Sequence, residues 1–412
     1  MASNTANTFT DSLNAMFKEV YSDKIDNLIP EGYKLNKAVP FMSKEKSPGN
    51  LYHQPVILGL EHGVTFASSD DDAFALNPPI SGVIKDAQIR GNPIVLRSAL
   101  GAMAAQRAQG AANSGNAQAF MDATKFLVAN MTRSIAKKLE ITLFHGQMGY
   151  GTVASTSGNV ITVTTAEWAP GIWAGAEKMP LEIRDTTGAT SRGVCNVTSV
   201  DLSARTVTVD ALPAGTTGTD VIWHRSAYGN EFAGVHKILT NTGTIFNISA
   251  STYSLWASQT QSAGSAELTM DVLEDAIALA VAKGLEGDTT VYVNPKTWSD
   301  LLSEQTAKRS YDQSYSSEVL KNGSKAVEFY SQSGKVSVEP SIYVKEGYAY
   351  VLNLEDFSKV GSTDVTFNRA SGEGKYFREM ENNLGFELKC LCDLALFCSA
   401  PGRSALINLI IN

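Results

Sequence analysis

The sequence predicts an α+β fold organised around one long helix and one long strand. In residues 116–145 apolar side chains recur every four positions, which places a ridge along a helix: Leu127, Met131, Ile135, Leu139 and Leu143. Residues 386–398 alternate between apolar and polar side chains, as a strand with one buried face does. At about 1.5 Å per helical residue and about 3.3 Å per strand residue, both elements reach roughly 45 Å. We therefore expect the helix and the strand to pack along each other.

A third observation is a change of character in residues 151–224. Threonine, valine and glycine dominate, and turn clusters separate short alternating runs at residues 159–164, 179–184, 194–197 and 206–210. This pattern predicts a small all-β module of about 70 residues, a barrel or a sandwich, inserted into the parent fold. Trp168 and Trp173 in this module either pack in its core or stack on a carbohydrate ligand.

The N-terminal part of the chain predicts two segments that extend from the body. Residues 9–26 have the spacing of a short amphipathic helix, and the following residues to position 50 lack a regular period and indicate an extended arm. Residues 51–97 predict a long hairpin with strands at residues 55–66 and 81–90. A two-stranded hairpin has little core of its own, so we expect another subunit to cover it.

The C-terminal half predicts a mixed domain of sheet and helices. Residues 269–282 form an amphipathic helix that ends near Gly284, and residues 289–293 form a buried strand. Asn294 then caps a second helix that has Pro295 at its first position. Short strands follow at residues 327–330, 336–338, 342–344 and 348–352. Residues 100–115 are compatible with either a helix or a loop.

Composition favours an oligomer in a reducing compartment. Of the 412 residues only 18% are charged and 43% are apolar, so we expect much of the surface to be covered in the working state. The net charge of −8 argues against wrapping nucleic acid by phosphate neutralisation, although it leaves room for enclosing nucleic acid that carries its own counterions. No run of about 18 apolar residues and no secretory signal is present, and four cysteines in so long a chain do not make a disulfide framework.

The sequence contains no arrangement of residues that predicts catalysis or ligand binding. Its histidines are scattered along the chain: His53, His62, His145, His224 and His236. Cys390, Cys392 and Cys398 share the apolar face of the last long strand, where buried, unreactive thiols are expected. No phosphate-binding loop or dinucleotide-binding glycine pattern appears. We therefore expect no enzyme activity, no cofactor and no metal.

The hairpin carries the candidate inter-subunit contacts. Asp70, Asp71 and Asp72 form a block at its tip, and a Ca²⁺ loop would need spaced oxygen ligands instead. They are either solvated or in electrostatic contact with a basic patch on a neighbouring subunit. Lys85 and Arg90 in the returning strand complete this set of candidate contact residues.

The order of these parts resembles the major capsid proteins of tailed bacteriophages, which have the Hong Kong 97-type fold. The residues that carry the resemblance are 140–146 at the end of the long helix, 232–239, 290–298 with its Asn-Pro after a strand, and 382–411. The resemblance implies an N-terminal arm (1–50), an E-loop hairpin (51–97), a spine helix with part of the peripheral domain (98–150), and an inserted all-β domain (151–224). A peripheral-domain return (225–265), an axial domain (266–375) and a terminal peripheral strand (376–412) would follow.

The resemblance implies a structural shell protein. Such a subunit assembles into pentamers and hexamers of an icosahedral head that encloses double-stranded DNA without reading its sequence. Because no long helical segment precedes the arm, a separate scaffolding protein is expected, together with a portal and in some relatives a decoration protein. Assembly would take place in the bacterial host cytoplasm, and the final location would be the virion. Some relatives crosslink their subunits through a lysine, but a partner for Lys85 is not evident, and crosslinking is not predicted.

Two other functions remain open at this stage. An encapsulin-like bacterial compartment would have the same fold and would hold an enzyme as cargo. An adhesive or glycan-binding protein would instead use the all-β module.

Overall fold

The computed structural model describes residues 31–42, 51–70, 73–101, 117–309, 327–367, 378–381 and 383–411. The predicted helix at residues 9–26, the undecided residues 102–115, and the acidic residues Asp71 and Asp72 lie outside these ranges.

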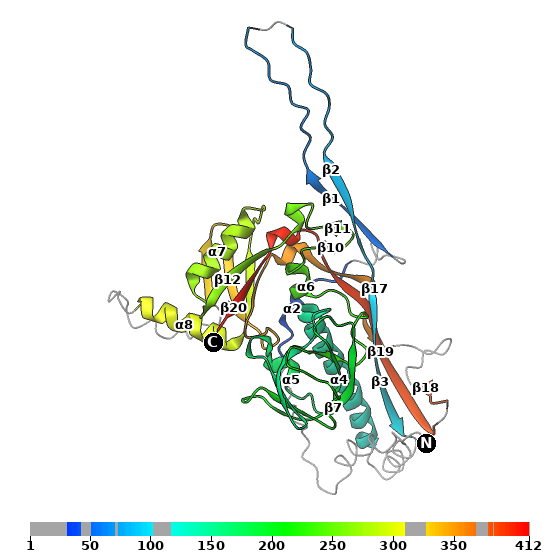
Figure 1. Ribbon diagram of the computed structural model, residues 1–412. Helices are drawn as coiled ribbons and strands as arrows, with labels where there is room; N and C mark the ends of the chain where they lie inside the picture. The colour runs from blue at the N-terminus through cyan, green and yellow to red at the C-terminus, as the bar shows by residue number, and fades with distance from the viewer. Residues whose placement is uncertain are drawn as a thin grey trace.

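The long helix and the long strand lie against each other, as the sequence predicted. Helix α4 (Ala117–His145) runs alongside strand β19 (Gly385–Cys398), which Figure 1 shows at the centre and right of the molecule. Four-residue spacing buries one ridge of α4, and alternation buries one face of β19, so that both faces meet in one core. The buried residues of this contact are Met131, Ile135, Leu139 and Leu143 from α4, and Leu388, Cys390, Cys392 and Leu394 from β19.

Strand β19 is the middle of an antiparallel sheet. It pairs with β3 (Asn92–Gly101) on one side and with β17 (Phe357–Phe367) and the short β18 (Arg378–Glu379) on the other. Strand β17 has two register shifts against β19, because its alternation is broken around Gly361. A Cβ atom at Gly361 would lie 2.1 Å from the Asp393 carbonyl oxygen, so only glycine allows this approach.

The end of α4 is packed so closely that it requires glycine at two positions. Helix α4 gives way to a turn at Gly146, and the residue with a left-handed backbone is Gln147 (φ 65°). A Cβ atom on Gly146 would lie 2.3 Å from the Phe232 carbonyl oxygen, and one on Gly234 would lie 2.6 Å from the Gly146 nitrogen. The Gly234 N–H donates to the Gly146 carbonyl at 3.0 Å, and helix α6 (Val235–Leu239) begins directly after it. Gly146 is thus needed for close approach, whereas the left-handed stop predicted at Gly146 lies one residue later, at Gln147.

Gly146→Ala is expected to lower the free energy of unfolding by about 1–3 kcal/mol, because backbone atoms rather than flexible side chains oppose the added methyl group. Gly101→Ala is the matched control, since nothing lies within 4 Å of a Cβ atom there. Urea unfolding of the two variants measures the difference. Equal midpoints would show that the helix end can shift to admit a side chain.

A second core forms around a six-stranded mixed sheet. Its strands, in spatial order, are β12 (Gln259–Ala266), β20 (Ala405–Ile410), β16 (Ala349–Leu352), β13 (Thr289–Val293), β15 (Gly334–Pro340) and β14 (Val327–Ser331). Helix α7 (Met270–Val281) packs on β12 and β20, and helix α8 (Pro295–Arg309) lies against β15. The cap predicted at Asn294 is present, because Asn294 Oδ1 accepts from the Lys296 N–H at 3.0 Å. Thr269, predicted as the first residue of its helix, is the N-cap of α7, and its hydroxyl accepts from the Val272 N–H.

The strand predicted at residues 342–344 is wrong. These residues form a buried turn, in which the Val344 N–H donates to the Ser341 carbonyl at 3.2 Å. Ile342, Tyr343 and Val344 are apolar and look strand-like in isolation, but they pack against α4 and the barrel described below instead of joining a sheet. Tertiary packing therefore overrides the local propensity here.

Residues 151–224 form a closed six-stranded barrel. Its strands, in order around the barrel, are β4 (Gly151–Ser157), β5 (Val160–Val163), β8 (Thr206–Val209), β7 (Ser191–Asp201), β6 (Pro180–Arg184) and β9 (Val221–His224), and β9 pairs with β4 to close it. Trp168 and Trp173 belong to the segment of chain that connects β5 to β6. Their rings are stacked with centroids 5.8 Å apart, and both side chains are fully buried. They are core residues and present no face to a carbohydrate.

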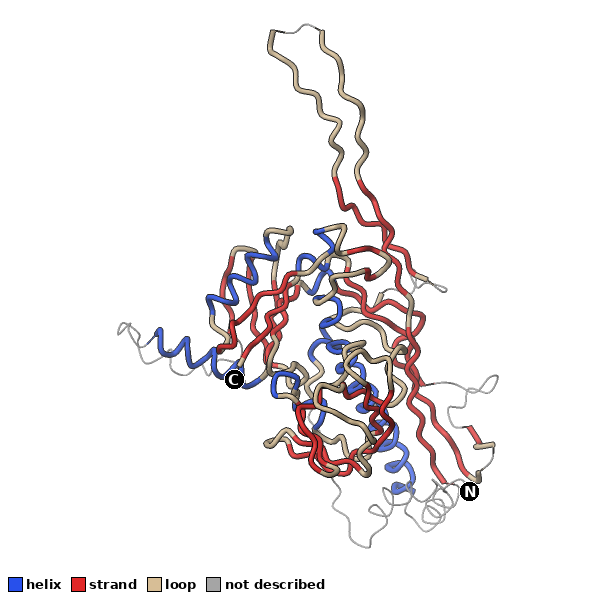
Figure 2. Tube along the Cα trace, viewed as in Figure 1, coloured by secondary structure: helices blue, strands red, loops and turns tan. Residues whose placement is uncertain are grey.

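The hairpin has a shorter ladder than predicted. Strand β1 (Tyr52–Gly59) pairs with β2 (Val83–Ile89), and residues 60–70 and 73–82 continue outward in an extended form without a ladder, drawn as tan loop beyond the red strands in Figure 2. At the other end, residues 92–97 belong to β3 in the body, so the hairpin ends near residue 90 instead of 97. Two short strands, β10 (Thr244–Ile245) and β11 (Ile248–Ser249), and helix α2 (Lys34–Ala38) complete the body.

Candidate assembly surfaces

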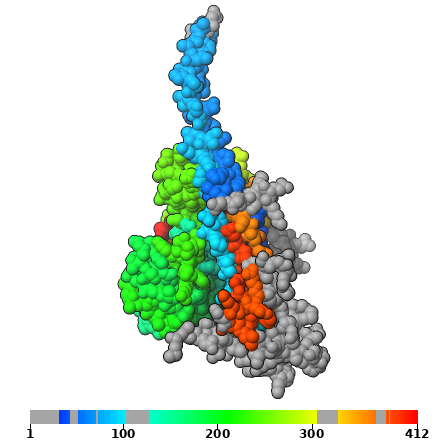
Figure 3. All heavy atoms as spheres, turned by 90° about the vertical axis from the view of Figure 1, so that its right-hand side faces the viewer, coloured from blue at the N-terminus to red at the C-terminus, as the bar shows by residue number. Residues whose placement is uncertain are grey.

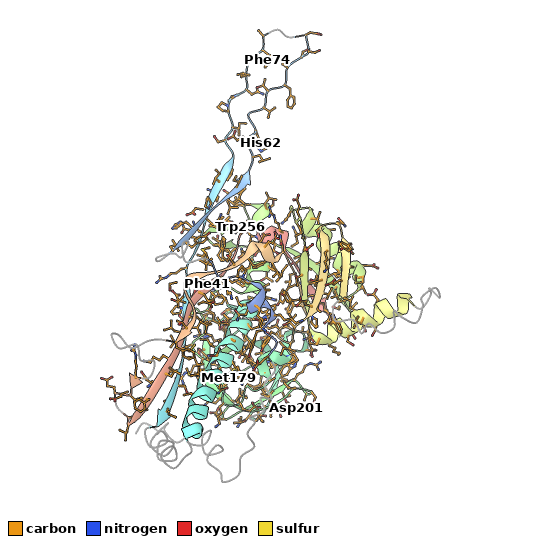
Figure 4. The ribbon with its side chains drawn as sticks, turned by 180° about the vertical axis from the view of Figure 1, so that it is seen from behind. Phe41, His62, Phe74, Met179, Asp201 and Trp256 are labelled. Atoms are coloured by element: carbon orange, nitrogen blue, oxygen red, sulfur yellow. The ribbon has the colours of Figure 1, made fainter. Side chains whose placement is uncertain are left out.

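Residues 60–82, here called the limb, extend away from the body with apolar side chains in water. Phe66 is 92% exposed, Leu76 79% and Leu60 74%. Figure 4 shows His62 and Phe74 far out on this limb, beyond the body's own side chains. A run of exposed apolar residues of this kind marks a surface that another molecule covers.

The limb is held in shape only by contacts between its two sides. The His62 N–H donates to the Ile80 carbonyl at 3.1 Å, and Asn77 bonds to Thr65 and to the Val64 carbonyl at 2.8 and 3.0 Å. These bonds hold the two antiparallel sides of the limb next to each other, and none of them connects the limb to the body. Within the described residues, the limb is therefore a preformed element whose apolar side chains the body does not cover.

The predicted contact residues are not brought together. Asp70 is exposed in the limb, whereas Lys85 lies in β2 and Arg90 directly follows that strand. The Lys85 ammonium group lies 5.9 Å from the ring centroid of Tyr253 in the same chain. These positions stay predictions as inter-subunit contacts.

A second candidate surface is the arm segment, residues 31–42, which crosses helix α4. Glu140 on α4 is fully buried, and its carboxylate accepts the N–H groups of Leu35 at 2.9 Å and Asn36 at 2.7 Å. The Lys359 ammonium group holds the same turn from the other side, donating to the Asn36 carbonyl at 2.9 Å. Residues 41 and 42 then run beside β17, where the Met42 N–H donates to the Lys359 carbonyl at 2.8 Å.

Burial shifts the pKa of the Glu140 carboxyl group. Removal from water raises this pKa to about 7, although the backbone donors of the arm segment and the Lys359 charge act in the opposite direction. Keeping the Glu140 carboxylate ionised in the folded chain therefore costs free energy. The group that binds the arm segment titrates near neutral pH.

A buried polar centre joins α4, the barrel and the six-stranded sheet. The Lys345 ammonium group pairs with the Glu167 carboxylate and donates to the Gly149 carbonyl at 3.3 Å, while the Tyr348 hydroxyl donates to Glu167 at 2.9 Å. Burial alone would raise the pKa of Glu167, but Lys345 and its hydrogen bond lower it to about 2. This centre fixes where the barrel leaves the body.

Two histidines meet at the same place. The rings of His145 and His236 lie 6.3 Å apart; His145 Nε2 is 2.7 Å from the Tyr343 carbonyl oxygen, and His236 Nδ1 is 2.9 Å from the Tyr350 hydroxyl. Burial lowers the pKa of His236 to about 4 and that of His145 well below its ordinary value. Sequence reasoning missed this encounter because 91 positions separate the two residues and no motif connects them. The cysteines of β19 are buried free thiols as predicted, and burial raises the pKa of Cys392 to about 12.

The sequence matches no protein-family model and no curated protein. Solved structures do match. The capsid asymmetric unit of cyanophage A-1(L) has a TM-score of 0.56 to this chain at 14% identity, over 95% of this chain and 98% of that one. The capsid of a native GTA particle has a TM-score of 0.50 at 10% identity, over the full length of both chains.

The fold is that of a phage capsid protein. The similarity spans nearly the whole chain. The holo-SrpI encapsulin complex from Synechococcus elongatus PCC 7942 is similar at a lower TM-score of 0.46, with 7% identity over 97% of this chain and 95% of that one. Among the helices that the structure describes, none is long and apolar enough to cross a bilayer.

Proposed function

We propose that this chain is the major capsid subunit of a tailed phage and that it assembles into an icosahedral head around double-stranded DNA. The observation that carries the proposal is the limb: a preformed, apolar extension that the described part of its own chain leaves uncovered, on a capsid fold. Exposed apolar surface of this extent is stabilised when a neighbouring subunit buries it. The role is structural and involves no catalysis.

The segments take the following parts in this proposal. Residues 1–50 are the N-terminal arm, residues 51–90 the E-loop hairpin, α4 the spine, and residues 151–224 a barrel inserted into the peripheral domain. Residues 225–265 return to the peripheral domain, residues 266–375 form most of the axial domain, and residues 376–412 end the peripheral domain. Two strands depart from these bounds, since β17 pairs with β19 of the peripheral sheet and β20 joins the six-stranded sheet. Asp70, Asp71 and Asp72 at the limb tip, with Lys85 and Arg90 at the root, contact neighbouring subunits.

The proposed partners follow from the same assignment. The chain forms pentamers and hexamers with itself, assembles in the host cytoplasm on a separate scaffolding protein beside a portal, and in the finished virion offers its outer face to a decoration protein. The acidic net charge of −8 fits a wall that contains DNA without binding its sequence. Movement of the limb and arm segment relative to α4 would accompany a change of shell size as a rigid-body rearrangement.

Expression of the chain with candidate scaffolding proteins, followed by electron microscopy, tests the proposal. We expect closed shells, and we expect a variant with residues 61–81 replaced by an Asn-Gly turn to form none while keeping the thermal midpoint of the parent monomer. Monomers or small oligomers under every condition would contradict the proposal. Shells from the native source that hold an enzyme instead of DNA would favour the encapsulin-like alternative.

A further inference from the structure

A groove of about 700 Å³ lies between β3, helix α4 and the barrel. Four consecutive residues of β3, 93–96, line it. Because successive side chains of a strand point to opposite faces, this lining places the groove along an edge of β3 instead of under one face. In the described part of the chain β19 is the only strand that pairs with β3, and Figure 3 shows β3 as a narrow strip between the barrel and β19. One backbone edge of β3 is therefore open towards the groove.

The open edge presents backbone groups in a fixed alternation. In an antiparallel pair every second residue directs its N–H and C=O to the partner strand, and the residues between them direct theirs outward. The pairing of β3 with β19 runs from Asn92 to Gly101 without a register shift, so this alternation is continuous along the groove. At one end the Asn92 side chain donates to the Asn230 carbonyl of the barrel at 3.2 Å. From there an extended peptide can continue the ladder along β3.

The groove is positively charged in a protein that is acidic overall. Its lining contains five cations and two carboxylates: Arg133, Lys137, Lys138, Lys178 and Arg225 against Glu177 and Glu231. The balance of +3 becomes +2 when Glu31, which pairs with Arg133 at 2.7 Å from outside the lining, is included. The whole chain carries a net charge of −8, so the sign is reversed locally. We call this feature the basic groove.

Three of these cations form no ion pair with another described residue. Lys137 on α4 donates to the Ala174 carbonyl, which is uncharged. Lys178 and Arg225 are exposed on the barrel side of the groove. By contrast, Lys138 is matched by a carboxylate of the lining. The basic groove therefore has cations available for an acidic ligand on both of its sides, α4 and the barrel.

Apolar side chains occur between these charges. Val95 is 59% exposed on β3, Ile141 of α4 is buried beneath the groove, and Met179 belongs to the barrel side. An open strand edge, unpaired cations and apolar side chains together match an extended peptide in which acidic and apolar residues alternate. Nucleic acid would use the cations, but it has no backbone donors and acceptors that continue a β-ladder.

We propose that the basic groove is the docking site for an extended acidic segment of a separate protein, which adds a strand to the open edge of β3. Side chains of one parity in this segment face the cations of α4 and the barrel, and those of the other parity lie beside Val95. The inference goes beyond the proposed shell function and does not depend on it, because the partner is not a capsid subunit.

Binding of a synthetic peptide to the full-length chain tests the chemistry of the site. The probe is the fluorescein-labelled heptapeptide Glu-Val-Glu-Ile-Glu-Val-Glu with blocked ends, followed by fluorescence anisotropy. We expect saturable binding that weakens as salt is raised. The block-order isomer Val-Val-Ile-Glu-Glu-Glu-Glu has the same composition and charge, and we expect it to bind about tenfold more weakly because the alternation is lost. No binding of the alternating peptide, or equal binding of both, would overturn the proposal.

Strand addition is tested by N-methylation of the alternating peptide. One version is methylated on the backbone nitrogens of its even residues and the other on those of its odd residues. Only one set of N–H groups faces β3, so we expect one version to lose binding and the other to stay within about threefold of the parent peptide. Equal effects of the two methylation patterns would overturn strand addition.

Reversal of the exposed groove cations locates the site on the protein. We expect Lys178→Glu/Arg225→Glu to weaken binding of the alternating peptide by about tenfold or more. The matched control, Lys37→Glu/Lys296→Glu, reverses two exposed cations outside the groove and should bind as the parent does. Circular dichroism and thermal midpoints equal to those of the parent show that both variants are folded.

Three results with these variants would overturn the proposal. The first is unchanged peptide affinity in the groove-reversed variant. The second is tighter binding of labelled oligothymidylate than of the peptide, which would make the groove a nucleic-acid site. The third is loss of self-association in the groove-reversed variant alone, which would make it a contact between copies of the chain. Failure of the parent to form shells, with peptide binding intact, would contradict the proposed function and leave this inference standing.

Discussion

Replacing Lys345 by alanine is expected to lower the free energy of unfolding by about 3–5 kcal/mol. Lys345 is buried and holds the carboxylate of Glu167, whose pKa of about 2 keeps it ionised at neutral pH. Without the ammonium group, Glu167 would be a largely buried charge with only the Tyr348 hydroxyl beside it. Such a charge is either retained at high cost or neutralised by taking up a proton, and both outcomes destabilise the fold.

A double-mutant cycle separates the ion pair from the packing around it. Lys345→Met with Glu167→Gln removes both charges at nearly constant volume, and we expect it to recover most of the lost stability. Lys335→Ala is the exposed control: it breaks the pair with Glu328 at 2.9 Å, in which both side chains are more than 40% exposed, and should cost about 1 kcal/mol or less. Urea unfolding with an unchanged slope measures all variants. Equal costs for Lys345→Ala and Lys335→Ala would refute the buried-charge account.

Glu140→Ala is expected to detach the arm segment from helix α4 and to cost about 2–4 kcal/mol. The substitution leaves the N–H groups of Leu35 and Asn36 without their acceptor, and each unsatisfied buried donor costs about 1–3 kcal/mol. Faster hydrogen exchange of these two amides, measured in the same variant, locates the effect in the arm segment. Glu177→Ala, an exposed acid of the barrel, is the control. Unchanged exchange at Leu35 and Asn36 would show that other contacts hold the arm segment.

The same carboxyl group predicts a pH dependence. Its pKa is about 7 in the folded chain and 4.5 in the reference state, so the folded state binds the extra proton between these values. The contribution of Glu140 to stability is therefore fully present below pH 4.5 and is lost as the pH rises through 7. The loss is about 3 kcal/mol for a shift of this size. Glu140→Gln carries no proton to lose, so the difference in unfolding free energy between the parent and this variant should change by that amount between pH 4.5 and 8. If the unfolding free energies of the parent and of Glu140→Gln change equally with pH, then burial does not shift the pKa of Glu140.

Periodicity predicted the elements that have one continuous apolar face. The four-residue ridge of α4 and the alternation of β19 determine a buried side whatever they pack against, and their equal length indicated that they pack together. Asn294 as a cap and Pro295 at the first helical position placed the start of α8 for a similarly local reason. The barrel strands were visible because turn clusters separate each alternating run.

Features that depend on distant partners were not predicted. Strand β17 has a glycine and two register shifts, so its alternation is lost in the sequence and restored only by pairing with β19. The limb keeps strand-like alternation to Phe66, yet its ladder ends at Gly59, just after a register irregularity between Ile57 and Gly59.

Substitutions in the limb are expected to affect assembly and the stability of the single subunit to very different extents. Its residues bury almost nothing within their own chain, so substitutions at Phe66 or Leu76 leave the melting of the isolated subunit nearly unchanged. A screen for heat resistance carried out on purified subunits would pass over them, while a screen for particle survival would detect them at once. If neighbouring subunits cover the limb as proposed, sequence changes in it alter the contact between subunits and leave the folding of each chain intact.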